Sequence, residues 1–244
     1  MARAAVTPEA IDYPDSDGLP MAENESQFWP ILYVGSALDH YFQERDDVYV
    51  VGNLLLYHQE ADPNTGKPGE SVSPDLMVVI GAPKHVRSSY KLWEEPKAPD
   101  FVLEIASEST WQADSGKKRD TYAEIGVSEY WQVDPVGAYL RPPLQGFRLV
   151  EGHYEPIPAA QRADGSLAGR SEVLGLELHL NPDAPVQEAL RFYDPVRGEP
   201  LRSLREAEAR LQELEAEVQA LRRGRRGPRQ EPDDPGRALE RVRF

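Results

Sequence analysis

Two carboxylates border or interrupt apolar segments of this chain, and a pair of lysines follows the second one. Asp75 comes directly before the apolar run 76–80, Glu104 lies inside the run 101–106, and lysines occupy positions 117 and 118. Burying an unpaired carboxylate is costly, so two such acids need a common partner. Mg²⁺ takes one or two carboxylates, keeps several waters and binds phosphate oxygens. These residues therefore indicate a site for a divalent cation.

The alternation of side chains along a strand predicts that the two acids can converge. Asp75 shares a face with Met77, and Glu104 faces opposite to Leu103. If the two strands are neighbours, the carboxylates meet near one end of the sheet. At about 4 Å and an effective dielectric of ~20 they would repel each other by roughly 4 kcal/mol. Either a divalent cation or a proton shared between the acids would remove that repulsion.

A helix predicted over residues 113–125 brings a cation to these acids. Asp114, Lys118 and Tyr122 have the spacing i, i+4, i+8, which places them on one helical face. A lysine beside a metal and water can orient the water or stabilise charge on a phosphoryl group. The same residues also fit a plain structural interpretation. Asp114 could be an N-cap, Lys118 could pair with it on the surface, and Asp75 could be a turn acid.

The order of the predicted elements indicates an α/β or α+β domain, with a mixed central sheet flanked by helices. A helix is expected over residues 25–45, where Pro30 is tolerable only in the first turn. Strands are expected over 48–57 with a break at Gly52 and Asn53, then over 75–80, 101–106 and 129–133. Gly126 has the position of a helix-ending glycine. A long loop is expected over 81–99, and short strands over 147–150, 154–157, 174–180 and 190–193.

The two ends of the chain differ from this domain, which we assign to residues 19–198. Residues 1–18 are expected to be a flexible lead-in, and the polar, Pro/Gly-rich residues 224–244 a disordered tail. Between them, residues 199–223 are predicted to form a helix. Its apolar residues have the 3-4-3-4-3 spacing of a short heptad seam: Leu204, Ala207, Leu211, Leu214, Val218 and Leu221. The segment 201–221 thus predicts self-association or partner binding, unless the helix docks on its own domain.

The composition limits the classes of partner. The 244 residues carry a formal net charge of −15 and include no cysteine, so disulfides and thiolate metal sites are excluded. No apolar run is long enough to span a bilayer, which predicts no membrane partner and a cytoplasmic location. DNA binding draws on Lys and Arg, so an acidic chain must concentrate them locally. Two basic stretches do so, 117–119 and 84–97, although a solvated loop is the preferred interpretation of the second.

Several short motifs follow one another in a characteristic order. They are Ser73-Pro74-Asp75, Phe101-Val102-Leu103-Glu104-Ile105-Ala106-Ser107, Ser109-Thr110, the Asp114/Lys118/Tyr122 trio, Gly126-Val127-Ser128-Glu129-Tyr130-Trp131 and Asp134-Pro135. In order and spacing the chain resembles the putative restriction endonuclease family of the PD-(D/E)XK nuclease superfamily, over about residues 20–195. The resemblance implies a restriction-endonuclease-like fold and DNA phosphodiester hydrolysis with Mg²⁺ or Mn²⁺.

Under this resemblance, Asp75 and Glu104 are the two motif acids, and the backbone carbonyl of Ile105 is a further metal ligand. The superfamily usually places its lysine two residues after the second acid, where this chain has Ala106. The resemblance therefore assigns the lysine to Lys118, on the following helix, with Lys117 as the adjacent alternative. An acid from the first helix often joins such sites, and here it would be Glu23 or Glu25.

Two other functions remain open from the sequence. A catalytically weak or inactive protein could keep the nuclease fold and act as an interaction protein through its heptad helix. A phosphoesterase acting on RNA or nucleotides would need less basic surface than a DNA endonuclease.

Overall fold

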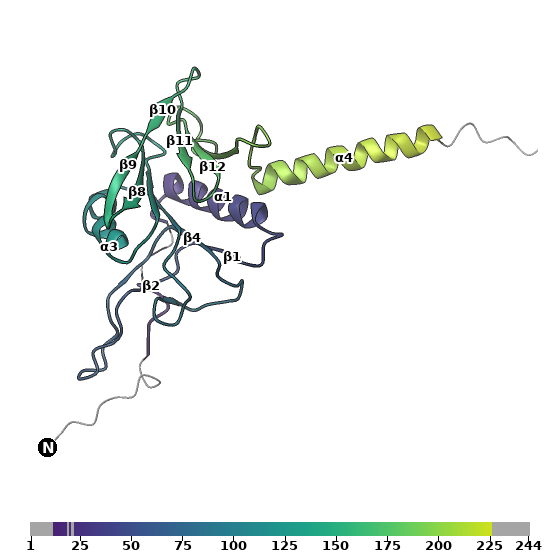
Figure 1. Ribbon diagram of the computed structural model, residues 1–244. Helices are drawn as coiled ribbons and strands as arrows, with labels where there is room; N and C mark the ends of the chain where they lie inside the picture. The colour runs from purple at the N-terminus through teal and green to yellow at the C-terminus, as the bar shows by residue number, and fades with distance from the viewer. Residues whose placement is uncertain (1–11, 19, 21, 226–244) are drawn as a thin grey trace, which may run out of the picture. The chain divides into compact units, whose positions relative to one another are not determined.

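The computed structural model describes residues 12–18, 20 and 22–225. The chain divides into one unit up to Ser203 and a second unit from Leu204 onward. Within the described residues, the main sheet of the first unit has six strands in the order β1-β4-β6-β7-β8-β9 (Figure 1). These are β1 (Val48–Val51), β4 (Leu76–Ile80), β6 (Phe101–Ile105), β7 (Glu129–Val133), β8 (Leu144–Val150) and β9 (His153–Ile157). β6 and β7 are parallel, whereas the other neighbours are antiparallel. The predicted mixed sheet is confirmed.

Helix α1 (Glu25–Tyr41) and a second sheet cover one face of the main sheet. Asn24 caps the helix by accepting hydrogen bonds from the backbone of Ser26 and Gln27. The second sheet consists of β10 (Ala159–Gln161), β11 (Leu167–Ser171), β12 (Leu176–Leu180), β13 (Leu190–Asp194) and β14 (Glu199–Pro200). Apolar side chains of α1, β12 and β13 share one core with the main sheet.

Trp131 of β7 fills the space between the two sheets. A Cβ atom on Gly146 or on Gly169 would lie 2.6 Å and 2.7 Å, respectively, from the indole ring. Only glycine therefore leaves room for the ring at these two positions. This large, fully buried side chain joins β7 and β8 of the main sheet to β11 of the second.

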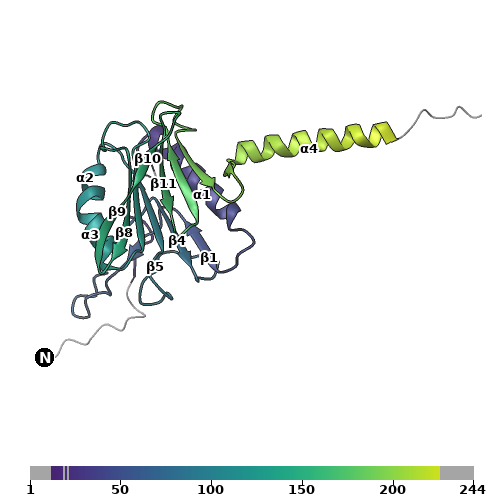
Figure 2. The ribbon, with the colours of Figure 1, turned by 45° about the horizontal axis from the view of Figure 1, so that its top comes forward.

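A helical segment covers the opposite face of the main sheet, as Figure 2 shows. It consists of α2 (Trp111–Ala113), the π-helical turn η2 (Asp114–Lys118) and α3 (Arg119–Glu124). Gly126, with φ 88°, follows its end as predicted. A small sheet of β3 (Ser71–Val72), β2 (Leu56–Tyr57) and β5 (Tyr90–Lys91) lies on the same side, and Leu56 and Tyr122 share a core there with Met77 and Val102.

The structure departs from the predicted elements in several places. Helix α1 ends at Tyr41 rather than at residue 45, and Pro30 lies in its second turn. The expected loop 81–99 contains β5, which pairs in parallel with β2. Three strands of the second sheet, β10, β11 and β14, were not predicted. Residues of the expected lead-in also contact the fold, because the Tyr13 ring lies 5.0 Å from that of Tyr57.

The second unit contains helix α4 (Leu204–Arg225), where the sequence predicts a helix. Its larger apolar side chains are exposed: Leu204, Leu211, Leu214, Val218 and Leu221. None of the helices in the described part of the chain is long and apolar enough to cross a membrane. Residues 1–11 of the expected lead-in and residues 226–244 of the expected tail lie outside the described residues.

Candidate active site

Asp75 and Glu104 come from neighbouring antiparallel strands. The pairing of Leu76 with Leu103 places Asp75, one residue before β4, opposite Glu104. Both carboxylates lie on the face of the sheet that the helical segment covers. Asp75 Oδ2 accepts a hydrogen bond of 2.7 Å from the backbone N–H of Ile105, which holds the start of β4 against the end of β6. The structure therefore brings the two predicted acids together.

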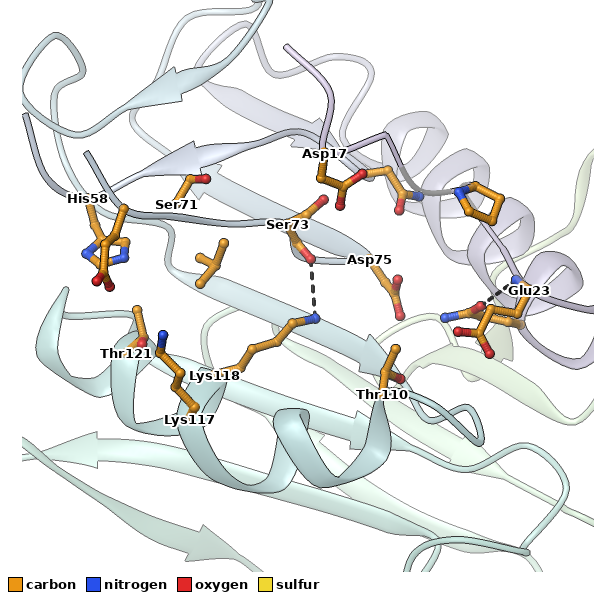
Figure 3. Close-up of a pocket in the computed structure, with 15 residues that line it drawn as sticks. Asp17, Glu23, His58, Ser71, Ser73, Asp75, Thr110, Lys117, Lys118 and Thr121 are labelled. Atoms are coloured by element: carbon orange, nitrogen blue, oxygen red, sulfur yellow. Dashed lines mark hydrogen bonds between the residues drawn. The ribbon is translucent and has the colours of Figure 1, made fainter. Parts of the chain in front are cut away.

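Lys118 extends from the π-helical turn to the same place. Its Nζ lies 3.1 Å from Glu104 Oε1 and 3.1 Å from Asp114 Oδ1. It also donates to the carbonyl of Ser73 at 3.4 Å, as Figure 3 shows. Single π-helical turns within α-helices occur frequently at functional sites. The turn here carries both Asp114 and Lys118.

Tyr122 completes the contacts of Glu104. Its hydroxyl donates a hydrogen bond of 2.6 Å to Glu104 Oε1, and both side chains are buried. Asp114 is also buried, yet its carboxylate accepts no hydrogen bond of ordinary geometry from the described residues. Its contact with Lys118 is an ion pair. Asp114, Lys118 and Tyr122 share the helical face that the sequence predicts.

Ionised together, Asp75, Glu104 and Asp114 would carry more negative charge than Lys118 can neutralise. Burial raises the pKa of Asp75 to about 7, despite the hydrogen bond from Ile105 and the charge of Lys118. Burial also raises the pKa of Glu104 to about 8, with the charges of Asp114 and Asp75 adding to the effect. Burial lowers the pKa of Lys118, but the three carboxylates outweigh it and raise that pKa overall. Lys118 is therefore a stable ammonium group near neutral pH.

Gln27 is a site residue that the sequence analysis missed. Its side-chain Nε2 lies 3.5 Å from the carbonyl oxygen of Ile105, and its Oε1 accepts a hydrogen bond of 2.9 Å from the backbone of Glu23. Gln27 is buried at the start of α1, one turn before Ile31 and two before Val34. A polar residue within the apolar stripe of a helix is a pattern visible in the sequence, and it could have identified Gln27.

A cleft of about 420 Å³ opens beside Asp75 (Figure 3), and Glu104 is not among its lining residues. The residues that line it include Asp17, Glu23, Glu70, Asp75, Lys117 and Lys118. Glu23 lines the cleft, and its carboxylate accepts a hydrogen bond from the hydroxyl of Ser109. Lys117, the alternative to Lys118, lines the cleft as well, whereas Glu25 is not among its lining residues. The cleft thus has more acidic than basic groups.

Asn53 lines the cleft, and Gly52, which precedes it, lies against the backbone of Asp75. Asn53 has a positive φ of 52°, and its buried side-chain Nδ2 has no hydrogen-bond partner among the described residues. Its backbone N–H donates to the carbonyl of Pro74. A Cβ atom on Gly52 would lie only 2.7 Å from the backbone oxygen of Asp75. The turn therefore fixes the position of the first acid.

The donor atoms suit a hard divalent cation. Within the described residues, no group of three or more His, Cys, Asp or Glu side chains is arranged to hold a metal ion. Asp75 and Glu104 offer two carboxylates, and the carbonyl of Ile105 offers a third oxygen. Mg²⁺ needs no more protein ligands than these, because it retains several waters. The uncompensated negative charge of the buried acids is the feature that such a cation would neutralise.

A comparison with the sequence models of known families shows which family the chain belongs to. The sequence model of the family Uma2, described as putative restriction endonuclease, matches residues 19–181. The chain belongs to the Uma2 family. The matched part of this Uma2 chain contains Asp75, Glu104 and Lys118, and it ends before helix α4. Membership supports a nuclease function in general.

Other comparisons add little to the Uma2 assignment. No curated protein matches the chain. One similar solved structure is a putative nuclease belonging to DUF820 from Anabaena variabilis ATCC 29413. It is 16% identical, has a TM-score of 0.41, and the match covers 59% of this chain and 72% of that chain. A superposition this loose says nothing about activity.

In the basic loop 84–97 of this Uma2 chain, the cationic side chains contact other residues of the fold. Arg87 pairs with Glu95 at 2.7 Å and lies over the ring of Tyr49. Lys91 and Lys97 pair with acids three residues further along the chain. Lys84 Nζ donates to the backbone carbonyl of residue 42. These contacts favour the interpretation of a structural loop over that of a DNA-binding surface.

Proposed function

We propose that this protein is a metal-dependent nuclease that hydrolyses phosphodiester bonds, with DNA as its substrate. The observation that supports this most is the contact of Lys118 with Glu104 at 3.1 Å, directly beside Asp75. Asp75, Glu104 and the carbonyl of Ile105 would hold Mg²⁺ or Mn²⁺. A cation bound there would supply Lewis-acid activation of water and charge neutralisation at the phosphate.

The protein's own groups have separable roles in this proposal. Lys118 stays protonated, so it stabilises charge on the phosphoryl oxygens or orients the attacking water rather than removing a proton. Tyr122 fixes the orientation of Glu104 through its short hydrogen bond. Asp114 is a positioning residue, because its carboxylate lies 3.1 Å from the Lys118 ammonium group.

The charge of the molecule favours a second candidate substrate. A duplex presents many phosphates, but the chain has a net charge of −15 and the cations of loop 84–97 are paired internally. A phosphoesterase acting on RNA or nucleotides would place few phosphates in the cleft. Such a substrate needs less basic surface than a duplex does.

The proposal is tested by Glu104→Gln in a plasmid-nicking assay with Mg²⁺ or Mn²⁺. We expect a loss of about a hundredfold or more, the scale seen when one electrostatic group is removed from a dry site. Glu108→Gln is the matched control, since it makes the same change at an exposed residue four positions away. Cleavage by Glu104→Gln at the wild-type rate would exclude the proposed site.

A substrate panel then separates the two candidates. Plasmid, single-stranded DNA, RNA and a small phosphodiester are each incubated with the wild-type protein and with Glu104→Gln. Activity on the plasmid that depends on Glu104 supports the endonuclease. Activity on RNA or the small diester alone supports the phosphoesterase, and no Glu104-dependent activity on any substrate would leave an inactive interaction protein.

A further inference from the structure

Helix α4 has a stripe of apolar side chains that are exposed in the part of the chain that the structure describes. The five larger apolar residues of the stripe are between 41% and 70% exposed. A contiguous row of exposed apolar side chains marks a surface that binds another molecule. Because these residues recur at heptad spacing, the fitting occupant is a second helix with the same spacing.

The seam assigns every residue of α4 to a heptad position. Leu204, Leu211 and Val218 take position a, and Ala207, Leu214 and Leu221 take position d. The flanking positions are then charged. Arg210 and Glu217 take position g, and Glu208, Glu215 and Arg222 take position e. These flanking charges decide which partner and which orientation fit.

A second copy of the same helix fits when it is parallel and in register. In that arrangement each g residue faces the e residue five positions later on the other helix. Arg210 then faces Glu215 of the second copy, and Glu217 faces Arg222 of the second copy. Both contacts join opposite charges, and twofold symmetry repeats each of them.

The antiparallel arrangement of the same seam is less favourable. It would bring Glu208 of each helix beside Glu215 of the other, which places like charges together twice. Its g positions would still pair Arg210 with Glu217. The attraction and repulsion offset each other there, whereas the parallel pair has attraction at every e–g contact that α4 contains.

We propose that the protein forms a homodimer through a parallel, in-register coiled coil of α4. The seam has 18 residues, from Leu204 to Leu221, or about two and a half heptads. So short a coiled coil dimerises weakly, in a concentration-dependent manner. Arg210 also pairs with Glu213 of its own helix at 2.9 Å, an exposed contact of little strength that competes with the contact between helices.

The orientation has a consequence for catalysis, which rests on the proposed nuclease function. The unit that contains the candidate active site precedes α4 in the chain. A parallel pair therefore joins two such units at the same end of the coiled coil. Two active sites in one particle could act on both strands of a duplex.

Cysteine cross-linking tests the orientation directly, because the natural chain has no cysteine. In the full-length protein, Val218→Cys places a thiol at position a, where the parallel pair brings it opposite its own copy. We expect mild oxidation to give a covalent dimer for this variant. Glu213→Cys, at the outward position c, is the control and should stay monomeric on a denaturing gel.

Two results would overturn this orientation. One is the absence of a Val218→Cys dimer at concentrations where the wild-type protein sediments as a dimer. The other is cross-linking that requires Ala207→Cys mixed with Val218→Cys, the pairing expected of antiparallel helices. A wild-type protein that sediments as a monomer at all accessible concentrations would overturn the dimer itself.

Charge reversal gives an independent test in solution. Glu215→Arg turns both symmetry-related contacts with Arg210 into repulsion, so we expect roughly tenfold weaker dimerisation. Adding Arg210→Glu to that variant should restore it. Glu213→Arg makes the same charge change at position c and removes the competing contact within the helix, so it should not weaken dimerisation. Tighter dimerisation of Glu215→Arg alone would indicate antiparallel helices, and sedimentation decides this without any measure of nuclease activity.

Discussion

Among the described residues, Lys118 is the cation that pairs with Glu104 and Asp114, and its positive charge makes the proximity of these acids tolerable. It contacts Glu104 and Asp114 at the same distance, and Asp75 also acts on its pKa. This lysine comes from the π-helical turn, rather than from the position two residues after the second acid, which is Ala106. The ammonium group nevertheless reaches the acid that the motif requires.

Replacing this lysine tests its role in cleavage. We expect Lys118→Met to lower cleavage by about a hundredfold or more, because the charge on the phosphoryl group loses its ammonium partner. Lys117→Met is the matched control and should retain most activity, since Lys117 only lines the cleft. The measurement is single-turnover cleavage with saturating Mg²⁺. If Lys117→Met lost more cleavage activity than Lys118→Met, the catalytic role would belong to Lys117.

The buried acids also predict how stability depends on pH in the metal-free protein. Glu104 has a folded pKa of about 8 against an ordinary value of 4.5. The folded state therefore binds more protons than the unfolded state between these values, and the free energy of unfolding falls as pH rises through this range. Asp75, with a pKa raised to about 7, acts in the same direction.

Thermal unfolding in a metal chelator measures this dependence. We expect the wild-type stability to decline from about pH 4.5 to pH 8. Glu104→Gln should decline less, because its side chain does not titrate. Glu108→Gln should follow the wild type. A wild-type profile that rises over this range would show that the acids are better compensated than the contacts of the site indicate.

At the scale of elements, the site depends on how β4, β6 and the helical segment meet. The register of β4 and β6 sets the two acids opposite each other. The π-helical turn sets Asp114 and Lys118 over them. The turn at Gly52 and Asn53 supports the start of β4, since Asn53 donates to Pro74 and Gly52 lies against Asp75.

Gly52→Ala tests this support. The new methyl group would lie 2.7 Å from the backbone oxygen of Asp75, so the start of β4 must shift. We expect a loss of about 1–3 kcal/mol in stability, together with reduced cleavage. Gly116→Ala in the π-helical turn is the control, because its Cβ would meet no atom within 4 Å. Equal effects of the two substitutions, in unfolding and in cleavage assays, would argue against a special role for the turn.

The sequence predicted the elements with strong apolar periodicity and missed those without it. β4 is a continuous apolar run and β6 is one that only Glu104 interrupts, so their faces and the convergence of the acids could be predicted. β10 and β11 are short and rich in small or polar residues, such as Gln161 and Gly169, and carry no such signal. Helix α1 was predicted too long because Phe42, buried just after the helix ends, continues the apolar pattern.

The least predictable site features depend on tertiary contacts. The π-helical turn adds one residue to a helical turn, and the spacing of Asp114 and Lys118 gives no sign of it. Gln27 joins the site through the backbone carbonyl of Ile105, a contact between positions 78 residues apart in the sequence. Such contacts follow from the packing of α1 against the sheet rather than from any local pattern.

For the whole molecule, charge limits how nucleic acid can bind. The net charge is −15, and the cations of loop 84–97 are paired within the fold. We therefore expect weak binding to duplex DNA with a shallow salt dependence. Two lysines in the cleft would give a slope no steeper than about −2 in a plot of the logarithm of the binding constant against the logarithm of the salt concentration.

Fluorescence anisotropy with Glu104→Gln and labelled duplex measures this slope without cleavage. The same measurement with Lys117→Met should reduce the slope by about one. A steep slope of −6 or beyond, as for proteins with many phosphate contacts, would contradict a cleft-limited interaction. It would point instead to a basic surface elsewhere in the chain.

The most direct measurement is a crystal structure of the protein soaked in Mn²⁺, with anomalous scattering to locate the metal. We expect a peak between the carboxylates of Asp75 and Glu104, beside the carbonyl of Ile105, and no such peak in Glu104→Gln crystals treated in the same way. Mn²⁺ bound only at other acidic residues, with Asp75 and Glu104 uncoordinated, would show that these acids are not a metal site.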